Sequence, residues 1–167
     1  TNTDTNIDID ANTDANTDAA DFVQRYVVAV FIEALVPVEA RDSFYFFSGQ
    51  HECDWNSEWY RSDASVVTMG IMCDDQQHVT DMVLQTVGLE GDIPLEIYFL
   101  PRLSTLALDV NHIGGAVPMI PTLTSLSLAY NELTGEIPTY VGLMTNLEDL
   151  TLSENLLQGT IPGDIEK

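Results

Sequence analysis

The chain is poor in basic residues. Five of its 167 residues are Lys or Arg, against 27 that are Asp or Glu, so the formal net charge is −22. The five basic residues are scattered along the sequence and form no patch that could neutralise phosphates. This excludes nucleic acid as a partner and disfavours anionic membrane surfaces. The excess of acid instead favours basic partners or multivalent cations.

Patterns typical of catalysis and membrane insertion are also missing. His51, His78 and His112 share no metal-ligand spacing, and there is no glycine-rich phosphate loop or kinase signature. We therefore expect no catalytic residues, no cofactor and no metal site. The strongest apolar run, residues 21–36, is shorter than the roughly 20 residues of a membrane span and contains Glu33. It predicts a packed helix, with a strand as the alternative because of its β-branched residues.

The first part of the chain has too little apolar content for a core. Residues 1–20 repeat Thr, Asn, Ala and Asp, and we predict that they are a disordered acidic tail. Asp8 and Asp10 begin a pattern of calcium ligands. Thr13 then stands where such a loop needs glycine, and Ala19 where it needs glutamate, so no calcium site is predicted.

The second half of the chain is built on a repeat. The pattern L-x-x-L-x-L-x-x-N-x-L-x-G-x-I-P occurs four times, starting at Val79, Leu103, Leu123 and Leu147. Its L-x-L centre alternates with period two, as in a strand whose apolar residues point inward. One such coil cannot bury its apolar face alone, so the coils must stack as a solenoid with a parallel sheet. We expect strands near residues 81–85, 105–109, 125–129 and 149–153.

Polar positions of the repeat have structural roles. Asn111, Asn131 and Asn155 come where the chain leaves each strand. An amide can both donate and accept, so it can satisfy turn groups that have no ladder partner. Stacked coils then form an asparagine ladder. The glycine predicts a positive φ or a close approach, and the proline marks a point where the sheet has ended.

One coil is shorter than the others. The repeat starts are separated by 24, 20 and 24 residues, so the second coil lacks four residues. The deletion falls after Pro118, on the return path rather than on the strand. We therefore expect a continuous sheet and a local constriction at the back of the solenoid.

These residues resemble the leucine-rich repeat family in its plant-type form, over residues 79–162. The segments 53–55 (Cys-Asp-Trp) and 70–73 (Gly-Ile-Met-Cys) are similar to the cysteine-paired N-terminal cap of its extracellular members, although residues 56–69 separate the two halves. The overall pattern is similar to secreted or membrane-tethered repeat proteins of diatoms and their relatives. The resemblance implies an α/β solenoid, a right-handed superhelix with a parallel β-sheet on its concave face and an N-terminal helical cap.

The same resemblance divides the chain and assigns its cysteines. It predicts a tail at residues 1–20, a cap at 21–78 and four repeats at 79–167. Composition alone leaves two free thiols and one disulfide equally open. The cap resemblance implies a bond between Cys53 and Cys73, and hence an extracellular or cell-surface location. No comparable cap follows the fourth coil, so we expect further repeats or self-association at that edge.

Outward-facing residues of the predicted strands form the candidate ligand face. It is either a recognition strip for a protein, peptide or glycan, or merely a soluble sheet face. The first interpretation predicts a non-enzymatic extracellular recognition module, the ectodomain of a receptor-like or secreted protein. The alternatives are a structural or adhesive matrix protein and the sensing part of a receptor kinase. The predicted face comprises Asp81, Val83, Gln85, Thr105, Ala107, Asp109, Ser125, Ser127, Tyr130, Asp149, Thr151 and Ser153.

Overall fold

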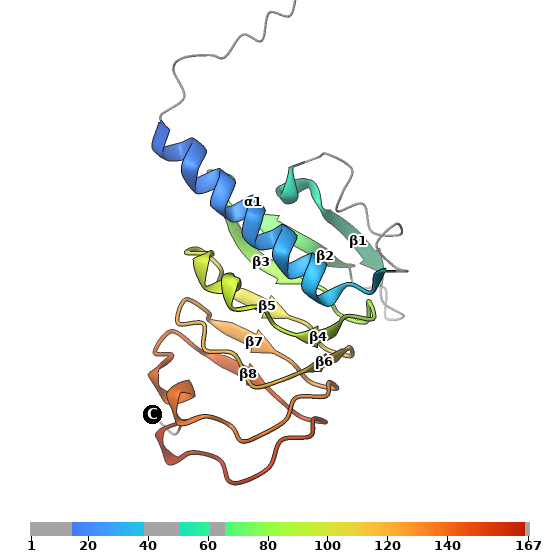
Figure 1. The fold of residues 1–167 in the computed structure, drawn as a ribbon, viewed down its shortest axis with the longest axis vertical. Coiled ribbons are helices and arrows are strands. Elements are labelled where there is room, and N and C mark those ends of the chain that lie inside the picture. The colour runs from blue at the N-terminus through green and yellow to red at the C-terminus, as the bar shows by residue number, and fades with distance from the viewer. Residues whose placement is uncertain (1–14, 39–50, 61–65, 166–167) are drawn as a thin grey trace, which may run out of the picture.

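The strands of the solenoid stack into one main sheet (Figure 1). A computed structural model describes residues 15–38, 51–60 and 66–165 of the chain. The main sheet has six strands in the order β1-β2-β3-β5-β7-β8. Their bounds are β1 Asn56–Tyr60, β2 Val66–Cys73, β3 Val79–Val83, β5 Thr105–Ala107, β7 Ser125–Ser127 and β8 Asp149–Thr151. The strands from β3 to β8 are parallel, whereas β1, β2 and β3 pair antiparallel.

The stacking places equivalent repeat positions side by side. Leu106 pairs with Leu126 and Leu126 with Leu150 in the sheet register, so the predicted parallel arrangement is confirmed. Inter-coil bonding continues past the short strands, because Leu108 N donates to Ser127 O and Val110 N to Ala129 O. The predicted span 105–109 is therefore longer than β5 itself. The first strand differs more, since β3 begins at residue 79 rather than 81.

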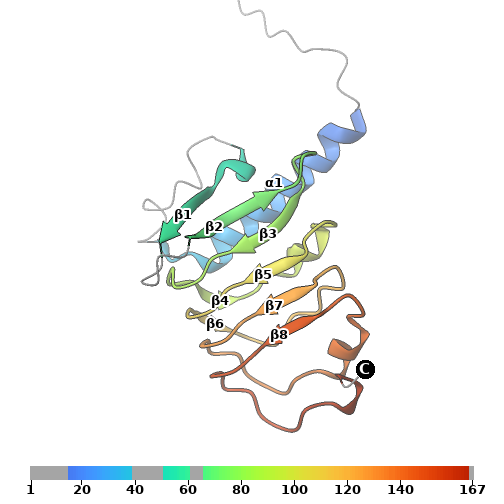
Figure 2. The ribbon, with the colours of Figure 1, turned by 180° about the vertical axis from the view of Figure 1, so that it is seen from behind.

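Helix α1, Ala15–Leu35, covers the core at the N-terminal end of the solenoid. It lies behind the sheet in the view of Figure 2 and packs against β4 (Glu90–Asp92) and the 3-10 helix η4 (Leu95–Phe99). Its buried face consists of Val27, Val28, Phe31, Ile32 and Leu35, each at most 1% exposed. This spacing repeats every three to four residues, so the helical alternative holds for residues 21–35 and the strand alternative is wrong.

The predicted boundary of the N-terminal tail requires a correction. We placed residues 15–20 in a disordered tail, but they form the first part of α1. Three of these six residues are alanine, the best helix former, and they extend a helix that tertiary packing already stabilises. Residues 1–14 lie outside the described part of the chain. No helix among the described residues is long and apolar enough to cross a membrane.

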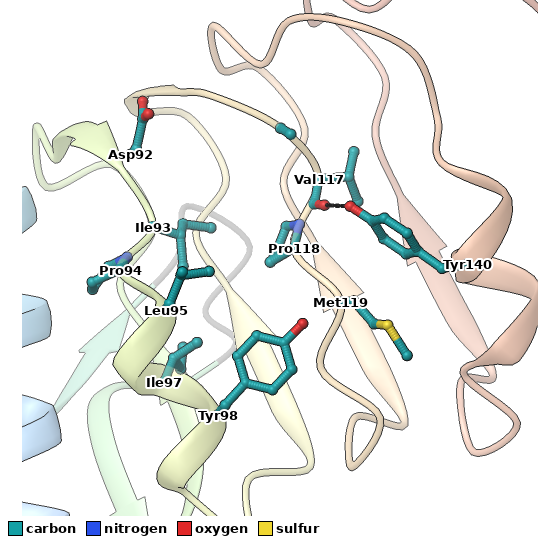
Figure 3. Close-up of a pocket in the computed structure, with 11 residues that line it drawn as sticks. Asp92, Ile93, Pro94, Leu95, Ile97, Tyr98, Val117, Pro118, Met119 and Tyr140 are labelled. Carbon is teal, nitrogen blue, oxygen red and sulfur yellow. Dashed lines mark hydrogen bonds between the residues drawn. The ribbon is translucent and has the colours of Figure 1, made fainter.

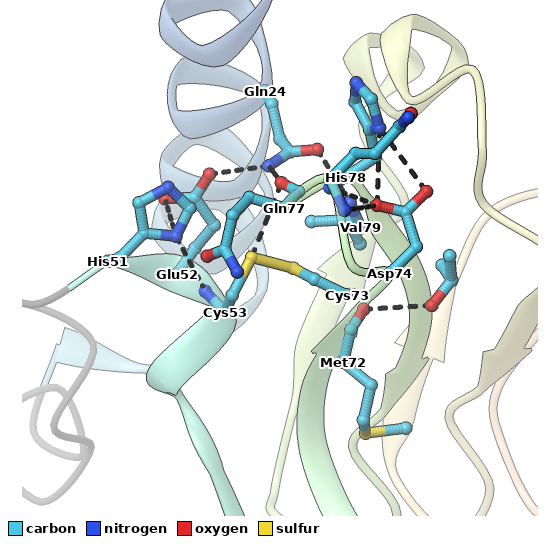
Figure 4. The surroundings of a disulfide bond; sticks show 12 residues. Gln24, His51, Glu52, Cys53, Met72, Cys73, Asp74, Gln77, His78 and Val79 are labelled. Carbon is cyan, nitrogen blue, oxygen red and sulfur yellow. Dashed lines mark hydrogen bonds and ion pairs between the residues drawn. A yellow bond between two sulfur atoms is a disulfide. The ribbon is translucent and has the colours of Figure 1, made fainter.

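The cap contains a hairpin that the repeat pattern did not predict. Residues between the two cysteines form β1 and β2, which extend the sheet beyond β3 by antiparallel pairing. The disulfide between Cys53 and Cys73 is present, as the resemblance implied (Figure 4). It joins the 3-10 helix η3, Glu52–Asp54, to the end of β2. The hairpin thus closes the edge of β3 that would otherwise face water.

A buried polar side chain of α1 fixes the helix onto the cap. Gln24 is 5% exposed, and its Nε2 donates to Glu52 Oε1 and to Gln77 O, both at 2.8 Å. Its Oε1 accepts from Val79 N at 2.7 Å. Arg25 Nε lies 3.5 Å from Glu52 Oε2, which partners the carboxylate that would be costly to bury alone. One amide therefore joins α1, η3 and the start of β3 (Figure 4).

The return path of the second coil is constricted as its length predicts. The first, third and fourth coils carry 3-10 helices at η4, η5 (Thr139–Leu143) and η6 (Gly163–Ile165). Residues 115–122, all of which the structure describes, contain no helical turn. The sheet nevertheless continues without a break through β5 and β7. Beside it, β4 and β6 (His112–Gly114) form a separate two-stranded parallel sheet.

Candidate functional site

The candidate ligand face is the surface of the main sheet that no helix of the described residues covers (Figure 2). Its columns follow from the strand register. Asp81 aligns with Thr105, Thr105 with Ser125, and Ser125 with Asp149. This column therefore places one carboxylate at each end and two hydroxyl groups between them. Strands are spaced about 4.8 Å apart, so three steps separate the two carboxylates by about 14 Å.

The second column is less available to a ligand. It aligns Val83, Ala107, Ser127 and Thr151. Ala107 is only 9% exposed, and Ser127 Oγ donates to Asp109 Oδ1 at 2.6 Å. Only Thr151 in this column is exposed. In the central part of the predicted face, the side chains are therefore buried or bonded to other residues of the protein, and few polar groups point to solvent.

Asp109 organises the neighbouring coils rather than pointing free into solvent. Its carboxylate accepts hydrogen bonds from Gln85 Nε2, Ser127 Oγ and Ala129 N. These donors come from the first and third coils, on either side of the coil that carries Asp109. Three hydrogen bonds satisfy most of a carboxylate's accepting capacity. Gln85, Asp109 and Ser127 are thus engaged with one another, which sequence alternation alone could not reveal.

Tyr130 sits at the edge of the face in an unusual backbone conformation. It has φ 54°, and the equivalent residues Thr86, Val110 and Glu154 have φ between 55° and 59°. Non-glycine residues adopt this conformation only where the surrounding structure enforces it. Tyr130 N donates to Ser153 O, and the turn leaves its side chain 59% exposed. A column of exposed side chains therefore borders the strip along the coils.

A row of hydroxyl groups, one from each of successive coils, borders the other side of the strip. Sequence reasoning did not predict it. Ser104 Oγ donates to Thr80 O, and Thr124 Oγ1 donates to Ser104 O, both at 3.1 Å. Each hydroxyl thus bonds to the equivalent residue of the preceding coil. The fourth coil has Glu148 at this position, which has no hydroxyl to donate. The signal was present in the sequence as Thr or Ser directly after the first apolar residue of each of the first three coils.

The three repeat asparagines form a column behind the turns, in which Asn111 and Asn131 are buried and Asn155 is half-buried. Asn131 Nδ2 donates to Leu108 O and Leu128 O, at 3.0 and 3.2 Å, and its Oδ1 accepts from Ile113 N at 3.0 Å. Asn111 and Asn155 make the equivalent contacts one coil earlier and later. Each amide therefore links adjacent coils through backbone groups that lack sheet partners. The column stiffens the solenoid and presents nothing to a ligand.

The electrostatics of the strip are simple. One end carries Asp81, which is half-buried, and the other carries Asp149, which is exposed; Glu154 borders the same edge as Tyr130. No group of three His, Cys, Asp or Glu side chains within the described residues is arranged to hold a metal ion. The arrangement can offer hydroxyl groups for hydrogen bonding, flanked by negative charge. It suits an extended ligand with donors and positive charge.

Comparisons with known proteins agree with this fold. The family model described as Leucine Rich Repeat matches residues 122–144 and 146–167. The chain is 30% identical over 112 residues, 66% of its length, to the leucine-rich repeat receptor-like serine/threonine-protein kinase RGI4 of Arabidopsis thaliana. It spans 8% of the length of that relative.

Solved structures give the same result over more of the chain. The BIR2 ectodomain from Arabidopsis thaliana superposes with a TM-score of 0.68 at 26% identity, covering 85% of this chain and 72% of that one. The leucine-rich repeat ectodomain of the Arabidopsis receptor kinase HAESA, in complex with an N-terminally extended IDA peptide hormone ligand, superposes with a TM-score of 0.71 at 25% identity. There the match covers 88% of this chain and 23% of the other.

The chain is therefore a leucine-rich repeat protein with plant-type repeats and a cysteine-paired N-terminal cap. Its fold is that of the extracellular parts of plant receptor kinases. The relatives described above come from Arabidopsis thaliana, so the similarity to diatom proteins stays a prediction.

Proposed function

We propose that this chain is a non-enzymatic extracellular recognition module that binds an extended peptide across the exposed face of its sheet. The observation that carries the proposal is the column Asp81–Thr105–Ser125–Asp149, which lies on the uncovered face in continuous register. The comparison with the HAESA ectodomain in complex with a peptide hormone supports a peptide ligand. The Cys53–Cys73 disulfide supports an oxidising, extracellular location.

The geometry specifies the peptide further. The two carboxylates are about 14 Å apart, and an extended peptide advances about 3.4 Å per residue. Basic side chains at positions i and i+4 can therefore reach Asp81 and Asp149 together. The hydroxyl groups of Thr105 and Ser125 then face the peptide backbone between them. Their small size allows the backbone to approach the sheet closely.

The test uses end-blocked synthetic peptides that carry two arginines at i and i+4, with a second set at i and i+1. Binding is measured by biolayer interferometry at two salt concentrations. We expect tighter, salt-sensitive binding of the i, i+4 set, and a loss of about two- to fivefold for Asp81→Asn or Asp149→Asn. Glu90→Gln removes an equal charge from the exposed strand β4 and serves as the matched control. Equal affinity of both peptide sets, or equal loss in the control, would overturn the proposal.

A second candidate is the sensing part of a receptor kinase, as opposed to a freely secreted protein. The likeness to RGI4, a receptor-like kinase, favours it. A matrix or adhesive role has no comparable support among the structures described above. Expressing the complete gene product with a tag and separating membranes from secreted material distinguishes the two. Recovery of the tagged protein in the secreted fraction alone would reject the receptor candidate.

Self-association at the fourth coil remains part of this proposal. Leu150, Leu152 and Leu157 are only partly buried in this chain, so a second apolar surface can pack there. Sedimentation of the 167-residue chain over a concentration series tests it. A monomer at every concentration would show that the partly exposed leucines need no partner.

A further inference from the structure

The constricted second coil leaves a groove on the side of the solenoid opposite to the ligand face. The groove lies between η4 of the first coil and Tyr140 of η5, where the second coil has no helical turn (Figure 3). Its volume is about 490 Å³, within the range of roughly 300–1,000 Å³ typical of ligand sites. A full-length second coil would place about four more residues here. The groove is therefore a direct consequence of the shortened repeat.

The walls of the groove are apolar and accessible. Leu95 and Tyr98 of η4 are 77% and 43% exposed, and both line the groove together with Pro94. Pro118 and Met119 of the second coil form the facing wall (Figure 3). Exposed leucine and tyrosine side chains that line a concave surface are typical of binding sites rather than of plain surface.

Tyr140 contributes its ring to the groove and keeps its hydroxyl engaged. Its hydroxyl donates to Val117 O at 2.7 Å, which satisfies the carbonyl in the constricted segment. Burial raises the pKa of Tyr140, and the nearby Tyr98 acts in the same direction. The phenol is therefore neutral at physiological pH, and its hydrogen goes to the protein backbone.

Charge distinguishes one end of the groove. Asp92 is the only charged residue among the eleven that line it, all of them within the described chain. Its carboxylate packs over Gly115, where an added Cβ would lie 2.8 Å from Asp92 Cγ. Gly115 also has φ 73°, a backbone conformation that favours glycine at this position. The exposed Asp92 carboxylate lies beside Gly115, at the rim of the groove.

We propose that this groove binds an extended peptide segment in which an apolar residue, leucine or proline, is flanked by arginine or lysine. The apolar residue fills the space between Tyr98, Met119 and Tyr140, and the basic residue pairs with Asp92. Prolines and aromatic rings on the walls suit an extended, proline-containing segment. The groove and the sheet face lie on opposite sides of the core, so either site can fail without the other.

The experiment uses a fluorescein-labelled octapeptide with a central Leu-Pro-Leu and one arginine on each side. Fluorescence anisotropy measures its dissociation constant for the complete chain and for two matched variants. Leu95→Ser removes an exposed wall residue of the groove, and Leu156→Ser removes an apolar side chain that is 58% exposed in the fourth coil. We expect a loss of roughly fivefold or more for Leu95→Ser, corresponding to about 1 kcal/mol, and no change for Leu156→Ser.

Charge and shape are tested separately. Asp92→Asn should weaken binding about threefold and reduce its salt dependence, whereas Glu90→Gln should leave both unchanged. Inserting four residues after Pro118 restores the repeat length and should abolish binding, with circular dichroism and the melting temperature reporting whether the variant folds. If it does not fold, the Leu95→Ser result decides alone.

Three results would overturn the proposal. The first is the absence of saturable binding by the arginine-flanked peptide at millimolar concentration. The second is equal binding of a version with serine in place of leucine and proline, because a polar ligand would then fit as well. The third is an equal loss in Leu95→Ser and Leu156→Ser. Loss of binding in Asp81→Asn rather than Asp92→Asn would assign the same peptide to the sheet face.

Discussion

The two ends of the main sheet are finished in different ways. Next to β3, the hairpin β1–β2 continues the sheet and α1 covers the core, so that Ile71, Val79 and Met82 are at most 1% exposed. At β8, Leu150 and Leu152 occupy the same repeat positions as fully buried leucines but are only partly buried. The difference shows that a coil does not bury its own leucines. Burial depends on what lies on both sides of the coil.

The largest expected effect compares a central coil with the fourth coil. Leu126 is 0% exposed, so Leu126→Ala should cost about 3–5 kcal/mol through lost transfer energy and a closed cavity. Leu150→Ala should cost clearly less, because the site is open to water and part of the side chain is already hydrated. Urea unfolding of both variants measures the two costs. Equal costs would show that the fourth coil is as well packed as the third.

The next effect concerns the N-terminal end. The disulfide joins residues 20 positions apart, and replacing both cysteines by serine should destabilise the chain by about 3 kcal/mol in the chain-entropy model. Hydrogen exchange should accelerate first in β1, β2 and β3, because the cysteines belong to the cap. The amides of the cap would then be as weakly protected from exchange as those at the β8 end of the sheet. Faster exchange confined to β8 would contradict this assignment of the disulfide's role.

The smallest effect also lies in the cap, at the turn before β3. The Asp74 carboxylate accepts from His78 N at 3.0 Å and Gln76 N at 2.9 Å, and the bond from His78 N is the main reason why its pKa is lowered. A carboxylate with a lowered pKa in the folded state stabilises the fold above its unfolded pKa, and this contribution is lost as pH falls through the folded pKa.

Carboxyl NMR titration tests this turn directly. We expect the pKa of Asp74 to lie below that of an ordinary aspartate, because its carboxylate accepts the two backbone hydrogen bonds of the turn. We also expect the contribution of Asp74 to stability to fade between the pKa of an ordinary aspartate, about 4, and the lower folded value. A pKa of Asp74 at the ordinary aspartate value would show that the turn does not hold the Asp74 carboxylate.

The structural roles of the repeat positions were predictable, because each depends on the residue type and on its place within the repeat. Leu106 and Leu126 recur in a period-two strand pattern, and Asn131 follows at the point where the strand pairing ends. Gly115 has the positive φ that the pattern predicts. Val110 is different: its positive φ belongs to a β-branched residue that disfavours it, so composition gave no sign of it. The neighbouring coils impose that conformation through the hydrogen bond from Val110 N to Ala129 O.

The candidate ligand face was predictable only in outline. Alternation places Asp109 and Ser127 on the outer side of the sheet, as it does Thr105 and Ser125. It does not show that Ser127 of the third coil donates a hydrogen bond to Asp109 of the adjacent second coil, because that contact depends on how far the two coils are offset. The strip that remains exposed is therefore narrower than the strip read from the sequence.

The sequence by itself determined the solenoid, its inward leucines, its asparagine column and the shortened second coil. These features follow from a periodic pattern, and a period specifies the contacts between adjacent coils. Only the tertiary structure decided how the cap closes the sheet, since Gln24 reaches Glu52 and Val79 across 28 and 55 residues. The tertiary structure also showed that the four missing residues leave a groove. The sequence gives only the length of the deletion, whereas the shape of the groove depends on where the neighbouring coils lie.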